Sequence, residues 1–297
     1  MTAPAGAAGG ARGGGPLAGA GPLIDAHAHF YHPRSPRGDW AEVNAARLRA
    51  GERIGITYHV ASILGSWGAS SPVYFPSPAD VTAGNDAMYA ICEREWRRVR
   101  AYVTVNPNHT AHAVAEIARG AARGAVGVKL AASRRADDPL LDPVCEAAAR
   151  HGFPVLHHVW QHRTREWPSQ EISDGADLAA LARRHPGVTF ILAHIGGGGD
   201  YMHTFPAIAD APNVVVDVSG SGVDRGMLDE AVLRLGVERI LWGSDVTMET
   251  GLAKLMGFEA IRLAAERMAL IRAGNALRIF PAGSFPEAAT AAAGAAR

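Results

Sequence analysis

The sequence contains few cysteines and no excess of either charge. Two of its 297 residues are cysteine, Cys92 and Cys145, and neither lies in a disulfide or metal-binding motif. We therefore expect both to be small, buried helix residues in a reduced protein, which favours a cytoplasmic location. Lysine plus arginine and aspartate plus glutamate each total 29, so the formal net charge is +0. Without a basic or acidic bias, neither nucleic acid nor an anionic membrane is an expected partner.

The sequence also lacks long apolar segments. No run of about eighteen apolar residues occurs, so we expect no membrane-spanning helix. The first twenty residues are rich in glycine and alanine and lack the apolar core of a secretory signal. The composition of the two ends predicts disordered tails at 1–21 and 284–297, with one folded domain at 22–283.

Between these ends, short runs rich in β-branched residues alternate with helical patterns. The runs are bounded by Gly, Pro, Asn or Asp, as buried parallel strands are. Eight of them are expected as strands: 23–28, 56–63, 100–105, 126–130, 154–158, 188–193, 214–218 and 240–243. The clearest helices between them are 111–123, 142–151, 176–185 and 224–235. This alternation predicts a parallel sheet with crossover helices, and eight such units fit a (β/α)8 TIM barrel.

A doubly wound open sheet is the alternative fold. Such a sheet normally carries a G-x-G-x-x-G phosphate-binding motif after its first strand, and none occurs there. The barrel is therefore the preferred prediction. Residues 31–77 are expected to contain long loops on either side of the second strand. In a barrel such loops lie over the mouth of the active site.

Histidines and one acid are found at the ends of the predicted strands. His27 and His29 lie two positions apart, so in a strand both side chains point to the same side. Two imidazoles on one face can bind one metal ion, whereas two unrelated surface histidines are the alternative. The later strands end in Lys129, His157, His158, His194 and Asp245. Because the strands of a barrel all end at one mouth, these side chains are expected to converge.

This set of residue types suits metal-dependent catalysis. Neutral imidazoles and one carboxylate are ligands of Zn, Mn and similar divalent ions. A catalytic metal ion keeps one position open for water and lowers the pKa of that water to about 7. Asp245 is the candidate for taking the proton from this water and delivering it to the leaving group.

Six motifs in a fixed order carry a family resemblance. They are Ile24-Asp25-x-His27-x-His29, Gly127-Val128-Lys129-Leu130, Pro154-Val155-Leu156-His157-His158, Ala193-His194-Ile195-Gly196-Gly197, Trp242-Gly243-Ser244-Asp245 and Gly274-Asn275-Ala276-Leu277-Arg278-Ile279-Phe280. Together they resemble the amidohydrolase superfamily. The nearest branch holds the aminocarboxymuconate-semialdehyde decarboxylase-like and dicarboxylate lactonase-like enzymes. The resemblance covers residues 22–281 and implies a distorted (β/α)8 barrel with one divalent metal ion, Zn in the first place and Mn as the alternative.

The resemblance also implies roles for single residues. The family's metal ligands match His27, His29, His158 and Asp245. His194 matches a histidine that either binds metal or orients and protonates the substrate. In the fifth strand, the family pattern Pro-Val-x-x-His places the ligand at His158 rather than at His157. Lys129 matches an unmodified lysine, and a carboxylated lysine that bridges two metal ions is the alternative.

Substrate contacts are expected from Lys129 and from the loop after the fifth strand, which contains Trp160, Arg163 and Arg165. Arginine binds carboxylates through two parallel hydrogen bonds, so a substrate carboxylate is one hypothesis. A solvated basic loop is the alternative. His59, within the second strand, is expected to be a core histidine with its hydrogen bonds satisfied.

These observations predict a metal-dependent hydrolase that opens a lactone, amide or related bond of a small substrate. A metal-dependent non-oxidative decarboxylase of a small aromatic or muconate-type acid is the alternative. Val159 stands where decarboxylase-like members have the proline of His-Pro-Trp, which favours hydrolysis. A catalytically inactive barrel that acts as a scaffold is the third hypothesis. A homodimer is the default expectation for the assembly.

Overall fold

The computed structural model describes residues 21–159, 173–195, 201–220, 225–245 and 251–295. Eight parallel strands form one sheet in sequence order. They are β1 (Leu23–His29), β2 (Ile56–Ser62), β3 (Val99–Val105), β4 (Gly127–Leu130), β5 (Val155–His158), β6 (Phe190–Ala193), β7 (Val214–Asp217) and β8 (Ile240–Leu241). Backbone hydrogen bonds from Ala26 N to Trp242 O (3.0 Å) and from Asp245 N to His27 O (2.7 Å) join the last strand region to the first. The predicted (β/α)8 barrel is therefore confirmed.

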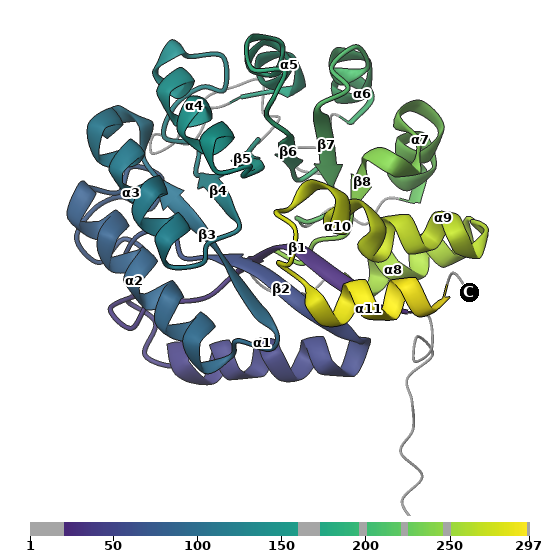
Figure 1. The fold of residues 1–297 in the computed structure, drawn as a ribbon, viewed down its shortest axis with the longest axis horizontal. Coiled ribbons are helices and arrows are strands. Elements are labelled where there is room, and N and C mark those ends of the chain that lie inside the picture. Colours follow the sequence, from purple (N-terminus) through teal and green to yellow (C-terminus); the bar gives the residue numbers. More distant parts are fainter. Residues whose placement is uncertain (1–20, 160–172, 196–200, 221–224, 246–250, 296–297) are drawn as a thin grey trace, which may run out of the picture.

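Helices surround the strands as an outer ring (Figure 1). The α-helices are α1 (Trp40–Ile54), α2 (Pro78–Arg94), α3 (Thr110–Ala122), α4 (Asp142–Arg150), α5 (Gly175–Arg184), α6 (Tyr201–Ile208), α7 (Arg225–Leu235), α8 (Gly251–Ala260), α9 (Ala265–Ala269), α10 (Asn275–Ile279) and α11 (Pro286–Ala295). Short 3-10 turns are η1 (Pro107–His109), η2 (Pro139–Leu141) and η4 (Val237–Arg239), and η5 (Leu270–Gly274) is a π-turn. Helix α1 occupies part of the region that was expected to be loop. Its buried Arg47, Leu48 and Gly51 have helical spacing, so the sequence did contain the signal.

The alternation of side chains along each strand creates two apolar layers. In β5 and β6, Val155 and Phe190 pack outward among the helices, whereas Leu156 and Ile191 belong to the cluster inside the barrel. Both faces of the strands are thus covered, which explains their nearly continuous apolar sequence.

Strand β1 departs from this alternation in its second half. Ile24 and Ala26 belong to the inner cluster, but Ala28 and Phe30 belong to the outer one. The pairing of β1 with β2 shifts register at the same place. The irregularity leaves two successive residues, Ala26 and His27, on the inner side, and it delivers His27 to the mouth of the barrel.

The same irregularity explains why Asp25 does not join the histidines of its own motif. Its Oδ2 lies 2.8 Å from Nδ1 of His59, and Ser244 Oγ donates to the same oxygen. The His59 ring reaches Gly51 of α1, where an added Cβ would lie 2.5 Å from its Nε2. His59 is therefore the satisfied core histidine that we predicted, in the layer between strand and helix.

The C-terminal segment, where a disordered tail was predicted at 284–297, contains helix α11 (Pro286–Ala295), and residues 296–297 lie outside the described residues. Phe285 is 2% exposed, and its ring lies 5.3 Å from Tyr58 and 5.4 Å from Phe280. Helices α10 and α11 lie across the ring of strands in Figure 1. Alanine, which we took as a sign of disorder, has the highest helix propensity, and one aromatic anchor docks the segment. Residues 1–20 of the predicted N-terminal tail lie outside the described residues.

Replacing Phe285 by alanine should lower the free energy of unfolding by about 3 kcal/mol, because it removes a buried ring and leaves a cavity. The measurement is thermal unfolding followed by circular dichroism. Leu233→Ala is the matched control, because Leu233 is 77% exposed. Equal melting temperatures of the two variants would contradict the docking of α11.

Both cysteines are free thiols in helices. Cys145 is buried as predicted, whereas Cys92 is only partly buried. Burial raises the pKa of each thiol to about 12, so neither is reactive at neutral pH. Among the helices that the structure describes, none is long and apolar enough to cross a membrane.

Candidate active site

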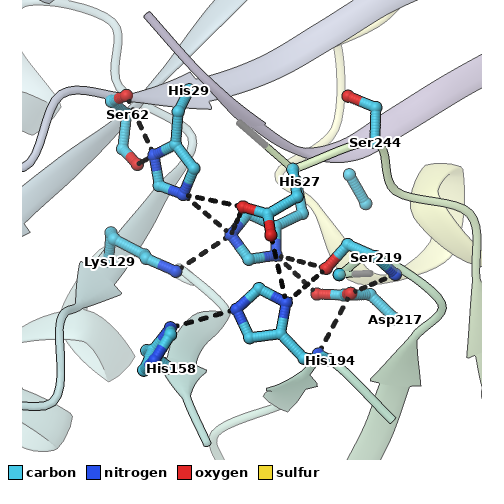
Figure 2. Close-up of polar contacts among 12 residues, drawn as sticks. His27, His29, Ser62, Lys129, His158, His194, Asp217, Ser219 and Ser244 are labelled. Carbon is cyan, nitrogen blue, oxygen red and sulfur yellow. Dashed lines mark hydrogen bonds and ion pairs between the residues drawn. The ribbon is translucent and has the colours of Figure 1, made fainter. Parts of the chain in front are cut away.

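The carboxyl ends of the strands bring the predicted site residues together (Figure 2). His27 and His29 come from β1, Lys129 from β4 and His158 from β5. His194 follows β6 directly, and Asp245 lies a few residues beyond the end of β8, where it forms an isolated bridge with Ala28 of β1. Residues separated by more than two hundred positions thus meet because parallel strands end at one rim. Trp160, Arg163 and Arg165, which were predicted to contact substrate, lie outside the described residues.

His27 and His29 face each other with their Nε2 atoms 3.1 Å apart. Nδ1 of His27 lies 2.9 Å from Oδ2 of Asp217, and Nδ1 of His29 lies 3.3 Å from the carbonyl oxygen of Ser62. A carboxylate and a carbonyl only accept, so both Nδ1 atoms carry the hydrogen. In a neutral imidazole this leaves both Nε2 atoms with a lone pair, and the two lone pairs point to the same place.

Electrostatics keeps these rings neutral. Burial lowers the pKa of His27 and of His29 well below the usual value, and the nearby Lys129 ammonium lowers each pKa further. Nζ of Lys129 lies 3.0 Å from Nε2 of His27 and can donate to its lone pair. Two neutral imidazoles whose opposite nitrogens are held by hydrogen bonds are ready to bind a cation.

The carboxylate of Asp245 lies opposite the Nε2 atoms of His27 and His29. Its Oδ1 is 3.6 Å from Nε2 of His29 and 4.0 Å from Nε2 of His27, and its Oδ2 is 3.5 Å from Nδ1 of His194. Burial would raise the pKa of this carboxyl, but the neighbouring imidazoles and Lys129 outweigh that effect and hold it below the usual range. The ligand atoms of His27, His194 and Asp245 all lie within 4.8 Å of one another. Neutral nitrogen donors around an ionised carboxylate fit a divalent metal ion.

The two later histidines form a second pair beside this cluster. Nδ1 of His158 lies 3.0 Å from Nε2 of His194, so His158 adjoins the cluster through His194. His157 points elsewhere, with its Nδ1 2.9 Å from the backbone oxygen of His158. Of the two adjacent histidines, His158 is the one beside His194, and its assignment as a metal ligand stays a prediction.

The backbone is strained at two of these residues. His194 has a φ of 69° and Asp245 a φ of 62°, the left-handed region that costs a non-glycine residue about 1–2 kcal/mol. Such conformations persist where surrounding contacts over-determine them, and they concentrate at functional sites. At Asp245 the contacts come from Arg47, whose guanidinium donates to the Asp245 carbonyl oxygen and to Ser244 Oγ (2.9 Å).

The sequence analysis missed several polar residues that complete the site. Asp217 Oδ1 accepts from Ser219 N at 2.8 Å, and Ser219 Oγ lies 2.9 Å from Nδ1 of both His27 and His194. The signal for Asp217 was present, because a single acid in the apolar run Val214–Val218 must have a buried partner. Lys254 of α8 is also buried, and its Nζ donates to Gly220 O at 2.5 Å. Nothing local in the sequence marked this lysine.

Replacing Asp217 by asparagine should weaken metal binding by about 10- to 100-fold, because the hydrogen bond that sets the His27 tautomer is lost. Competition of the purified protein with a chelating dye measures the metal dissociation constant. The exposed Asp210→Asn provides the control. An unchanged dissociation constant in Asp217→Asn would show that Asp217 does not orient His27 for a metal.

Two aromatic side chains lie against the histidines from outside. The Trp67 ring is 5.9 Å from that of His29, and the Tyr74 ring is 5.4 Å from that of His158. Both come from the segment between β2 and α2, one of the loops that we expected over the mouth of the barrel.

Comparisons with known proteins agree with this architecture. The crystal structure of 5-carboxyvanillate decarboxylase from Sphingomonas paucimobilis superposes with a TM-score of 0.67 at 17% identity, over 87% of this chain and 98% of that chain. The 2,6-dihydroxybenzoate decarboxylase from Rhizobium has a TM-score of 0.66 at 19% identity, over 87% and 98% of the two chains. A dihydroxybenzoic acid decarboxylase from Polaromonas sp. JS666, with bound manganese and the inhibitor 2-nitroresorcinol, has a TM-score of 0.66 at 17% identity, over 87% and 96%.

At such identities the structural likeness establishes the fold. No curated protein matches the sequence significantly. Residues 24–282, however, match the family described as amidohydrolase. This match spans most of the chain and agrees with the resemblance carried by the six ordered motifs, so the protein belongs to the amidohydrolase family.

Proposed function

We propose that the protein is a metal-dependent enzyme that releases carbon dioxide from a small aromatic or unsaturated carboxylic acid without an oxidant. This reverses the order of our two sequence-based hypotheses. The observation that supports it best is a pair of buried lysines, Lys129 on β4 and Lys254 on α8. Lys129 and Lys254 are 0% and 1% exposed, and buried ammonium groups favour an anionic substrate.

The charge balance of the site supports an acid as substrate. Three buried cationic side chains, Lys129, Lys254 and Arg47, stand against three carboxylates, Asp25, Asp217 and Asp245. A bound divalent ion therefore leaves the site with an excess of positive charge. A substrate carboxylate offsets that excess, whereas a neutral lactone or amide does not. The similar solved structures include decarboxylases of 5-carboxyvanillate and of dihydroxybenzoates, which supports the same substrate class.

We assign the metal to His27, His29 and Asp245, with a further imidazole from His158 or His194. Manganese, which the Polaromonas enzyme binds, and zinc both suit these donors. The bound ion would supply a positive charge that holds the acid and stabilises negative charge on it.

The side chains of the protein would then deliver a proton to the substrate. Breaking the bond to the carboxyl carbon leaves an electron pair on the ring or alkene carbon, and that carbon must accept a proton as carbon dioxide departs. His194 and Asp245 are the proposed proton carriers, since each lies within the cluster and His194 is held by Ser219 on one nitrogen and His158 on the other. Solvent returns the proton to the carrier after each turnover, so acid plus proton gives product plus carbon dioxide.

The test is incubation of manganese-loaded protein with hydroxybenzoates and muconate-type acids without oxygen. We expect carbon dioxide and the decarboxylated product in equal amounts. Hydrolysis is the second candidate, because the ionised Asp245 could take a proton from water, and Val159 replaces the proline of the decarboxylase-like motif. Hydrolysis of lactones or amides with no carbon dioxide from any acid would overturn the proposal.

A further inference from the structure

The segment between β2 and α2, residues 63–77, places aromatic rings on two separate histidines of the site. Trp67 meets the His29 ring nearly edge-on, with an interplanar angle of 86°, and Tyr74 is tilted by 40° over His158. Both aromatic side chains are partly exposed. One loop therefore supplies a wall of two rings beside the metal-binding residues.

The loop is attached to the barrel at three points. Trp67 Nε1 donates to the carbonyl oxygen of Phe30 at 2.8 Å. Ser133 Oγ, after β4, donates to the carbonyl oxygen of Tyr74. Asn106 Nδ2, after β3, donates to the carbonyl oxygen of Pro76 at 2.9 Å. Bonds to the ends of three different strands fix the loop relative to the site.

Asp80, in the first turn of α2, binds four serines of the loop or its end through hydrogen bonds. Its carboxylate is buried and accepts hydrogen bonds from four serine hydroxyls, those of Ser66, Ser70, Ser71 and Ser77. We call these five residues the serine clasp. Burial would raise the pKa of Asp80, but the four hydroxyls outweigh this and hold it well below the usual range. Hydrogen bonds to an ionised carboxylate are roughly twice as strong as neutral ones.

The packing under the loop leaves little freedom. Gly65 has a φ of +62°, and an added Cβ would lie 2.9 Å from Cβ of Pro76. On α2, an added Cβ at Gly84 would lie 2.7 Å from the carbonyl oxygen of Gly65. The loop backbone therefore packs directly on α2, the helix that carries Asp80. The serine clasp adds hydrogen bonds to a loop that this packing already restricts.

We propose that the serine clasp preorganises an aromatic wall for planar substrates, with Asp80 as a positioning residue that acts through Tyr74 and Trp67. Asp80 itself does not touch the substrate. The inference rests on the proposed function only in taking a small acid as the ligand, and it does not depend on the reaction that follows. Without the clasp, the two aromatic side chains would have to be ordered by the ligand, at a cost in affinity.

The test compares two acids that differ in the ring. Calorimetry on manganese-loaded protein would measure the binding of 2-hydroxybenzoate and of 2-hydroxyhexanoate, which has no ring. We expect the wild type to prefer 2-hydroxybenzoate. Asp80→Asn should raise the dissociation constant of 2-hydroxybenzoate by about tenfold, because its ring contacts Trp67 and Tyr74. The dissociation constant of 2-hydroxyhexanoate, which has no ring, should change little. Asp86→Asn, on the exposed face of the same helix, is the matched control.

A double-mutant cycle with Tyr74→Leu separates positioning from a general loss of stability. Because Asp80 acts partly through Tyr74 and partly through Trp67, Asp80→Asn should weaken the binding of 2-hydroxybenzoate clearly less in the Tyr74→Leu background than in the wild type. Ser71→Ala, which removes one hydroxyl, replaces Asp80→Asn if that variant does not fold. Three results would each overturn the inference. Asp80→Asn could weaken the binding of both acids equally, the two substitutions could have multiplicative effects on the dissociation constant, or the wild type could bind both acids equally well. If the protein prefers the acid with a ring but releases no carbon dioxide from any acid, the proposed function is refuted and the inference about the aromatic wall is retained.

Discussion

Replacing Asp245 by asparagine is expected to lower kcat/KM by about 10³-fold or more. The amide keeps the shape of the side chain but removes the negative charge that lies 3.5 to 4.0 Å from three imidazoles. It can neither carry a proton nor balance a divalent ion. The measurement is steady-state kinetics on the acid that proves to be the best substrate, together with the metal content of the purified variant.

The control for this experiment is Asp210→Asn, the same change at an exposed position after α6. It should retain wild-type kinetics. A circular dichroism melt of Asp245→Asn shows whether the barrel is intact, since the backbone of residue 245 also bonds to His27 O. A folded Asp245→Asn variant with more than about a tenth of the wild-type activity would contradict the role of this carboxylate.

Removing the metal ion should abolish activity and lower the melting temperature. The Nε2 atoms of His27 and His29 lie 3.1 Å apart, so one cation can bind both lone pairs and hold the two rings together. A ligand present at 100 times its dissociation constant stabilises the folded state by about 2.7 kcal/mol, and that stabilisation is lost on chelation. The measurements are activity and thermal unfolding before dialysis against a chelator, after it, and after adding back manganese or zinc.

His29→Ala is the matched variant for the metal experiment. It removes one of the two facing imidazoles, so its melting temperature should respond little to added metal. Activity that survives complete removal of metal, or a wild-type protein that melts alike with and without it, would refute a metal-dependent mechanism.

The sequence predicted the parts of the site that depend on local pattern. Two-residue spacing placed His27 and His29 on one side of a strand, and their Nε2 atoms do meet. The same rule would have put Asp25 beside them. It failed there because the irregularity in β1 changes the face of the strand between Asp25 and Ala28, and such irregularities arise from pairing with a neighbouring strand.

Other parts of the site had no local signature. Asp217 of β7 contacts His27, and Lys254 of α8 donates to Gly220 O in the segment after β7. Only the packing of those elements shows these contacts. For the residues of α11 the sequence predicts a tail, because these residues carry almost no apolar surface of their own. The helix is anchored by Phe285, whose ring packs against that of Tyr58, 227 positions earlier in the sequence.

By itself, the sequence determined the alternation of strands and helices, the barrel and the chemical types of the site residues. These follow from hydrophobic periodicity and from side-chain chemistry, which are properties of short segments. Tertiary structure alone decided which nitrogen faces which oxygen, the left-handed backbone of His194 and Asp245, and the clasp that holds the aromatic loop. Those features depend on contacts between segments far apart in the chain, and short-range patterns carry no information about such contacts.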